Sequence, residues 1–215
     1  MKVLSSDLSP YATRVRIYVR MKDLPVDILP PDLPLRSPEF LKKYPFGKIP
    51  LLINDKGESL AESWTIMQYL ESCYPHPALQ PVDPWLLAQM NARGRFADTH
   101  LAPMTFPLFG QLMGRGKVDL AAQVGLIRFE LAKAETIWGQ LAPLPQRSVD
   151  LADIGLLPVL YFVLALPKLL GHQDDLLSHY PLLQQWWNQM QSIDAVKLSL
   201  SELENAFKAM TSRPA

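Results

Sequence analysis

The chain has 215 residues, and its 21 basic and 21 acidic side chains give a formal net charge of zero. With 48% apolar residues it has the composition of a globular protein, and no basic stripe favours nucleic-acid binding. A single cysteine, Cys73, excludes an internal disulfide and is expected to be an inert packing thiol. The longest apolar stretch, residues 154–166, is too short for a membrane span, and no charged-then-apolar leader follows Met1, so we expect a soluble, cytoplasmic protein.

The first part of the chain predicts strands and helices in alternation. Strands are expected at residues 2–4, 26–29 and 51–54 and after a turn at 55–57, and helices are expected from residue 9 to before residue 25, at 38–43 and at 62–72. This order predicts a mixed sheet of four strands. Ser9 is a favoured helix cap, with Pro10 at the first helical position. The basic residues of this helix are expected on its solvated face: Arg14, Arg16, Arg20 and Lys22.

Prolines at positions 75, 77, 81 and 84 indicate a linker, and strand patterns end there. Helices are expected at residues 85–113, 119–141, 150–166, 181–192 and 199–210. The predicted organisation is therefore an α/β domain over residues 1–76, a linker over 77–84 and an all-α helical bundle over 85–215. Pro103 and Pro107 should bend or break the first of these helices. Asp150 and Asp153 resemble a capping box worth about 1 kcal/mol of stability.

Four short motifs follow one another in the chain: residues 8–17 (a serine, a proline, an aromatic and then Arg-Val), 46–50, 61–66 and 150–154. In this order they resemble the cytosolic glutathione transferases of the serine type. The resemblance covers residues 1 to 155 and implies a thioredoxin-like N-terminal domain followed by a helical domain. One departure is Tyr44-Pro45, where the family usually has Asn-Pro in a supporting loop. The place of Ile49-Pro50 before a short strand predicts a cis peptide bond.

By this resemblance, Ser9 is the catalytic residue. Its hydroxyl would donate a hydrogen bond to the sulfur of glutathione and stabilise the thiolate, which is the nucleophile. A serine before a helix is also explained by capping alone. Tyr11, Ser5 and Ser6 are rival hydroxyls, because other classes of the family use a tyrosine or an earlier serine.

The resemblance also implies the residues that bind glutathione. Glu62 would pair with the γ-glutamyl ammonium, Ser63 and its amide would meet the adjacent carboxylate, and Lys48 would neutralise the glycyl carboxylate. Ile49 would contribute its backbone, presented by Pro50. The alternatives are that Glu62 and Ser63 only cap a helix and that Lys48 is an ordinary surface lysine.

The acceptor site for a second substrate is expected mainly in the helical domain. The candidates are Tyr11, His100, Met104, Phe106, Phe109 and Met113. Phe106, Phe109 and Met113 have the spacing of one apolar helix face, which ordinary packing explains as well. No histidine has ligand-like spacing with a cysteine or an acid, so no metal is expected.

The expected activity is attack of bound glutathione on a small, largely apolar electrophile, as in detoxification, by a homodimer. Two alternatives stay open. One is another glutathione-dependent enzyme on the same scaffold, such as an isomerase, dehalogenase or peroxidase. The other is a non-enzymatic relative that uses the fold as an interaction module, like the stringent-starvation cofactors.

Overall fold

The computed structural model describes residues 1–212 and divides into two compact units. One unit contains Met1–Leu79 together with the chain from Asp194 onward, and the other contains Gln80–Ile193. The strands of the first unit are β1 (Lys2–Leu4), β2 (Asp27–Leu29), β3 (Leu51–Ile53) and β4 (Ser59–Leu60). Its helices are α1 (Pro10–Met21), α2 (Pro38–Lys43), α3 (Ser63–Cys73) and α9 (Asp194–Thr211). The mixed four-stranded sheet is confirmed, and the strands lie in the order β2-β1-β3-β4.

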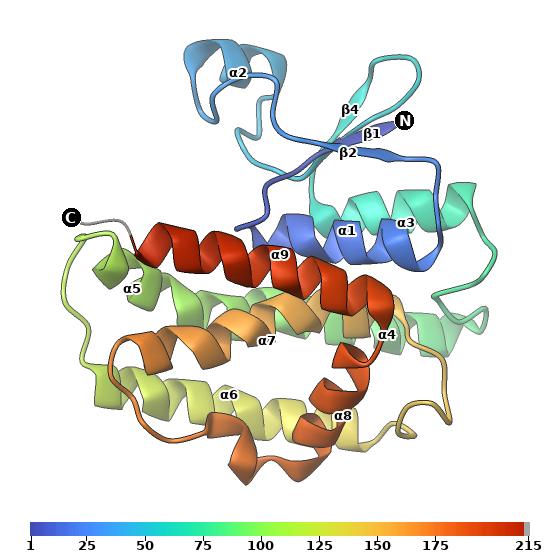
Figure 1. Ribbon diagram of the computed structural model, residues 1–215. Coiled ribbons are helices and arrows are strands. Elements are labelled where there is room, and N and C mark those ends of the chain that lie inside the picture. The colour runs from blue at the N-terminus through green and yellow to red at the C-terminus, as the bar shows by residue number, and fades with distance from the viewer. Residues whose placement is uncertain (213–215) are drawn as a thin grey trace. The chain divides into compact units, whose positions relative to one another are not determined.

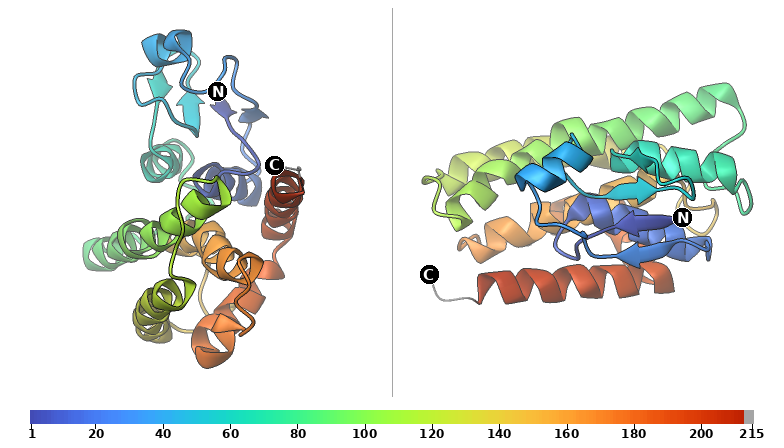
Figure 2. Two further views of the ribbon diagram at one scale, coloured as in Figure 1. Left: turned by 90° about the vertical axis from the view of Figure 1, so that its left-hand side faces the viewer. Right: turned by 90° about the horizontal axis from the view of Figure 1, so that it is seen from above.

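The two faces of this sheet are covered by different helices. Strand β1 pairs parallel with β2 and antiparallel with β3, while β3 pairs antiparallel with β4. Figures 1 and 2 show α1 and α3 along one face and α2 on the other. On the α2 face, Leu4, Leu51 and Ile53 are buried with Phe40 and Tyr44, whose rings meet edge to face with centroids 5.1 Å apart. The aromatic ring at the Tyr44 departure is therefore part of the core.

The last helix, α9, packs against α1 and belongs to the unit that contains the sheet. The helical character expected for residues 199–210 is confirmed, and the helix starts five residues earlier, at Asp194. The division at 1–76 and 85–215 stays a prediction about domains. Assignment of a terminal helix to one unit depends on long-range packing, which local sequence patterns do not contain.

The second unit consists of helices joined by loops, with no strand among its described residues. Its elements are α4 (Pro84–Phe96), a π-helical turn (Ala97–Leu101), α5 (Ala102–Leu112), α6 (Leu120–Gly139), α7 (Leu151–Leu169), a short 3₁₀ helix (Leu176–His179) and α8 (Pro181–Gln191). The first long helix is distorted by a π-helical turn just before Pro103, but it is not broken, and Pro107 lies inside α5. Helix α7 has the length and hydropathy of a membrane span, but 78% of that window is buried inside the protein, as in a core helix.

A buried carboxylate fixes the start of α7. The predicted capping box of Asp150 and Asp153 is confirmed. Asp153 is fully buried and accepts hydrogen bonds from Arg147 at 2.5 and 2.8 Å. It also accepts from the indole Nε1 of Trp138 at 3.2 Å and of Trp186 at 2.8 Å. The contribution of Asp153 to stability therefore exceeds that of a cap alone.

Two expectations about exposure are wrong. Arg14 and Arg16 are 0% and 1% exposed and Lys22 is 7% exposed, so these basic residues of α1 do not form a solvated face. Lys22 pairs with buried Glu71 of α3 at 2.6 Å. Cys73, expected to be packed, is exposed at the end of α3. The burial of basic residues on α1 does not follow from helical periodicity, because what covers the far side of α1 comes from distant parts of the chain.

Candidate functional site

The register of the sheet brings three predicted site segments to one edge. Leu4, the last residue of β1, pairs with Leu51, the first residue of β3, and Leu60, the last residue of β4, pairs with Leu52. The segments that leave the sheet at this edge are residues 5–9 after β1, residues 48–50 before β3 and residues 61–63 after β4. The predicted catalytic serine and the predicted glutathione-binding residues thus share one edge of a single unit.

Ser9 is the N-cap of α1. Its backbone is extended, and its Oγ accepts a hydrogen bond from the amide of Ala12 at 3.2 Å. The capping role is therefore confirmed. A hydroxyl that accepts a hydrogen bond retains its own proton, so capping leaves Ser9 able to donate to a ligand. The positive end of the α1 dipole lies at the same point and favours a negative charge there.

The peptide bond between Ile49 and Pro50 is cis, as predicted. Pro50 is buried, Lys48 is exposed, and the Ile49 side chain packs against the α2-side core. Gly47 shapes the turn that leads to this segment. It has φ +63°, and a Cβ there would lie 2.7 Å from Cδ2 of Leu41. A side chain at position 47 would therefore be both strained and crowded.

Glu62 has an unusual backbone at the start of α3. Its φ of 68° and ψ of 109° place a non-glycine residue in a sparsely populated region, at a cost of order 1–3 kcal/mol. Its side chain is exposed and makes no capping hydrogen bond. The alternative that Glu62 acts as a side-chain cap is therefore wrong. Ser63 is 5% exposed, and it begins α3, where amides have no partner within the helix.

These features together suit a small zwitterionic ligand. The N-termini of α1 and α3 and the ammonium of Lys48 favour anionic groups, whereas the free carboxylate of Glu62 favours a cation. Among residues 1–212, no group of three histidine, cysteine or acidic side chains is placed to hold a metal ion.

The remaining candidates, apart from Tyr11 in α1, belong to the second unit. Phe106 of α5 and Met113, just after this helix, are 57% and 50% exposed. Phe109, between them, packs edge to face on Phe162 of α7 with centroids 4.9 Å apart. Packing thus explains Phe109, while Phe106 and Met113 remain open to a ligand.

The other two candidates of this unit, His100 and Met104, also have contacts within it. The ring of His100 stacks on Phe96 at 5.1 Å, and its Nδ1 lies 3.3 Å from Glu130. The backbone carbonyl of Met104 accepts a hydrogen bond from Gln123 at 2.9 Å. Their side chains are exposed and half-buried, respectively.

Three residues that the motifs do not single out lie next to residues 5–9, the loop between β1 and α1 that ends at Ser9. They are Thr13 and Arg16 of α1 and Glu202 of α9, and all three make hydrogen bonds within this region. A signal was present, because Arg16 lies two turns after Ser9. The sequence nevertheless predicts a solvated arginine, because nothing in the local pattern indicates that α9 lies beside α1.

Comparison with known proteins identifies the family. The N-terminal domain model of glutathione S-transferase matches residues 4–78. Maleylacetoacetate isomerase of Pseudomonas aeruginosa is 30% identical over 75% of this chain and 80% of its own length. A probable glutathione S-transferase of Oryza sativa subsp. japonica is 26% identical over 92% of this chain and 86% of its own. The chain belongs to the glutathione S-transferase family.

Solved structures show the same fold. A glutathione S-transferase from Methylobacillus flagellatus with glutathione bound has a TM-score of 0.76 and 25% identity, over 92% of this chain and 98% of the other. A delta-class glutathione transferase of Nilaparvata lugens has a TM-score of 0.79 and 21% identity, over 98% and 99%. The thioredoxin-like domain followed by a helical domain is thereby confirmed.

Proposed function

We propose that this chain is a glutathione transferase-like enzyme that activates the thiol of glutathione for attack on a small electrophile. The observation that carries the proposal is the convergence of Ser9, the Ile49-Pro50 bond and Glu62-Ser63 at one sheet edge. Glutathione is a zwitterion with two carboxylates, one ammonium and a thiol, and this edge offers a complementary group for each. The relative from Methylobacillus flagellatus has glutathione bound, which supports the same ligand here.

Each group in the site receives one role. The hydroxyl of Ser9 donates to the sulfur, and the N-terminus of α1 stabilises the developing thiolate. The carboxylate of Glu62 binds the γ-glutamyl ammonium, and Ser63 with its amide binds the neighbouring carboxylate. The backbone of Ile49, next to Pro50, pairs with the cysteinyl backbone, and Lys48 neutralises the glycyl end.

The reaction follows from holding this thiolate next to an electrophile. Proximity and stabilisation of the negative sulfur supply the rate enhancement, and no side chain forms a covalent intermediate. The acceptor would be small and largely apolar. Tyr11, His100, Met104, Phe106 and Met113 stay candidates for contact with it, whereas Phe109 packs on Phe162.

We also propose a cytoplasmic homodimer. Large apolar side chains are exposed in both units: Phe46 at 64% in the first, and Val82 at 94% and Trp85 at 70% in the second. We propose that these side chains contribute to an association surface. The resemblance implies that the first domain of one subunit pairs with the second domain of the other, which would cover exposed side chains of both units.

A second candidate activity is glutathione-dependent isomerisation, because one relative at 30% identity is a maleylacetoacetate isomerase. The same thiolate would serve, adding to the substrate and leaving again after bond rotation. An assay panel of aryl halides, epoxides, isothiocyanates, peroxides and a cis-configured unsaturated diacid separates the two activities.

Retention on glutathione-agarose, with elution by free glutathione, tests the proposal at its first step. We expect specific retention, and turnover of at least one compound in the panel. A folded protein that does not bind glutathione would instead support a non-enzymatic interaction module.

A further inference from the structure

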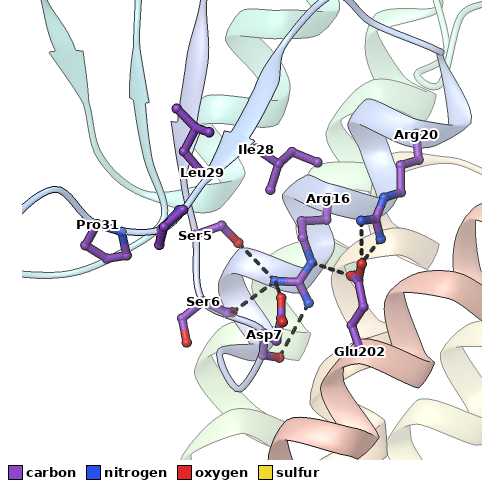
Figure 3. Close-up of a pocket in the computed structure, with 10 residues that line it drawn as sticks. Ser5, Ser6, Asp7, Arg16, Arg20, Ile28, Leu29, Pro31 and Glu202 are labelled. Carbon is purple, nitrogen blue, oxygen red and sulfur yellow. Dashed lines mark hydrogen bonds and ion pairs between the residues drawn. The ribbon is translucent and has the colours of Figure 1, made fainter.

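The guanidinium of Arg16 is buried in the loop that leads to Ser9. Its side chain is 1% exposed, and its Nε donates to Glu202 at 3.1 Å. Its Nη1 donates to Ser5 Oγ and to the Ser6 carbonyl, both at 2.9 Å (Figure 3). Its Nη2 donates to Thr13 Oγ1 at 3.0 Å and to a loop carbonyl, that of Asp7, at 3.4 Å. All five N–H donors of the arginine are thus engaged.

Two of these acceptors also form hydrogen bonds with the backbone of Ser9. The Ser6 carbonyl also accepts the amide of Ser9, at 3.1 Å. The Thr13 hydroxyl, which accepts from Arg16, donates to the carbonyl of Ser9 at 2.9 Å. The amide and the carbonyl of Ser9 are therefore each hydrogen-bonded to a group, the Ser6 carbonyl or the Thr13 hydroxyl, that also accepts a hydrogen bond from Arg16.

The carboxylate of Glu202 anchors this arrangement from α9. Besides Arg16, it binds Arg20 through both oxygens, at 2.8 and 2.7 Å, and Figure 3 shows the carboxylate of Glu202 between the two guanidinium groups. A pocket of about 450 Å³ opens beside them, so Glu202 and Arg20 remain partly exposed while Arg16 is covered. A buried guanidinium is costly unless it is paired and fully bonded, and both conditions are met here.

We infer that Arg16 is a positioning residue that sets the orientation of Ser9 toward the thiol of glutathione, acting through Thr13 and Ser6 and anchored by Glu202. The inference rests on the proposed function. Its physical basis is that a hydrogen bond to a thiolate depends steeply on geometry, and a misplacement of about 1 Å can lower a rate roughly a hundredfold.

The variant Thr13→Val tests this inference with little change in shape. Valine fills the same volume but removes the hydroxyl between Arg16 and Ser9. We expect the pKa of enzyme-bound glutathione, measured by thiolate absorbance, to rise by about 0.5–1 unit and kcat at pH 6.5 to fall about three- to tenfold. The KM for glutathione should change less than about twofold, because the groups that bind its two ends are untouched. Thr13→Ser retains a hydroxyl and should restore the wild-type pKa.

Two further variants keep the test decisive. Thr136→Val removes an equivalent bond from a helical threonine to a carbonyl, Ala132, in the second unit, and should leave the thiol pKa unchanged. Glu202→Gln leaves every Ser9 contact in place but weakens the anchor, and should raise the thiol pKa by a smaller amount than Thr13→Val does.

An unchanged thiol pKa and kcat in folded Thr13→Val would overturn the inference. If Thr13→Val does not fold, an unchanged pKa in Glu202→Gln would overturn it. Failure of the wild type to bind glutathione would overturn the proposed function itself.

Discussion

Ser9 and Glu62 each define the start of a helix, α1 and α3, and each also has a polar group that remains available to a ligand. Ser9 uses an oxygen lone pair to cap α1 and keeps its proton. Glu62 leaves its carboxylate in solvent while its backbone is held at φ 68°. Strain of this kind persists only where surrounding structure enforces it, and it is concentrated at functional sites. In both residues, therefore, one group is held by the fold and another stays available to bind a ligand.

The Glu62→Gln variant should weaken glutathione binding without weakening the fold. Loss of a charge-assisted hydrogen bond costs about 1.5–3 kcal/mol, which corresponds to roughly a ten- to hundredfold rise in the Kd for glutathione. The melting temperature should stay the same, because the side chain makes no capping bond. Isothermal titration calorimetry provides the measurement. Glu39→Gln, an exposed acid in the first turn of α2, is the matched control. Equal affinities for both variants would contradict the assignment.

The starts of the helices can be predicted from neighbouring residues in the sequence, whereas the buried face of a helix cannot. Helix α2 occupies Pro38–Lys43 as predicted, with Ser37 as its cap, because the serine and the following proline define its start. The cap of α1 and the capping box of α7 were predictable for the same reason. The buried face of α1 was not, because whether Arg16 meets solvent or Glu202 is decided by a helix almost two hundred residues away.

The start of α7 should depend strongly on Asp153. Asp153→Ala leaves Arg147 without its buried partner and both indole N–H groups without an acceptor. We expect the free energy of unfolding to fall by about 3–5 kcal/mol, as for other broken buried ion pairs. Urea denaturation gives the value. The control is Asp194→Ala, since that carboxylate is 98% exposed and pairs only with Lys197 in the same turn. A loss near the 1 kcal/mol of a simple cap would contradict the buried network.

The contribution of Glu202 to stability should disappear in acid. Burial raises the pKa of this carboxyl, but hydrogen bonds and attraction from Arg20 and Arg16 outweigh burial, so the pKa lies below its ordinary value of 4.5. A lowered pKa in the folded state means that the charged form stabilises the fold above pH 4.5 and that this contribution is lost as the pH falls through the folded-state pKa.

Thermal unfolding between pH 7 and pH 3 tests this. The difference between wild type and Glu202→Gln should be constant near neutrality and should shrink below about pH 4.5. Glu204→Gln, on the same helix with an exposed carboxylate, is the control. A difference that stays constant down to pH 3 would mean that charge on Glu202 does not contribute.

At the scale of the whole molecule, the family and the two-part architecture were predictable, and the functional edge was predictable in part. Ser9, Ile49-Pro50 and Glu62-Ser63 lie on short motifs whose meaning is local, and the sheet register gathers them. The supporting residues Thr13, Arg16 and Glu202 come together only in the folded chain. A sequence pattern identifies groups that touch a ligand more readily than groups that hold those groups in place.

The proposed homodimer should be sensitive to its exposed aromatic residue in the first unit. Phe46→Glu should convert the dimer to a monomer, because a charge in an apolar contact is left without a partner. Sedimentation velocity at micromolar protein concentration distinguishes the two states. Leu35→Glu changes another exposed apolar residue, 45% accessible, in the same unit and should remain dimeric. A monomeric wild type would contradict the proposal.

The most direct test of the central claim is the pH titration of thiolate absorbance in the enzyme–glutathione complex, for wild type beside Ser9→Ala. Removal of the cap should itself cost about 0.5–2 kcal/mol of stability, so both proteins are compared under conditions where each is folded. We expect the bound thiol in the wild type to titrate well below the value of about 8.5 for an ordinary cysteine, and the pKa to rise by about one unit in the variant. If the two titration curves coincide, Ser9 is only a cap, and activation of the thiol must be assigned to another hydroxyl of this edge.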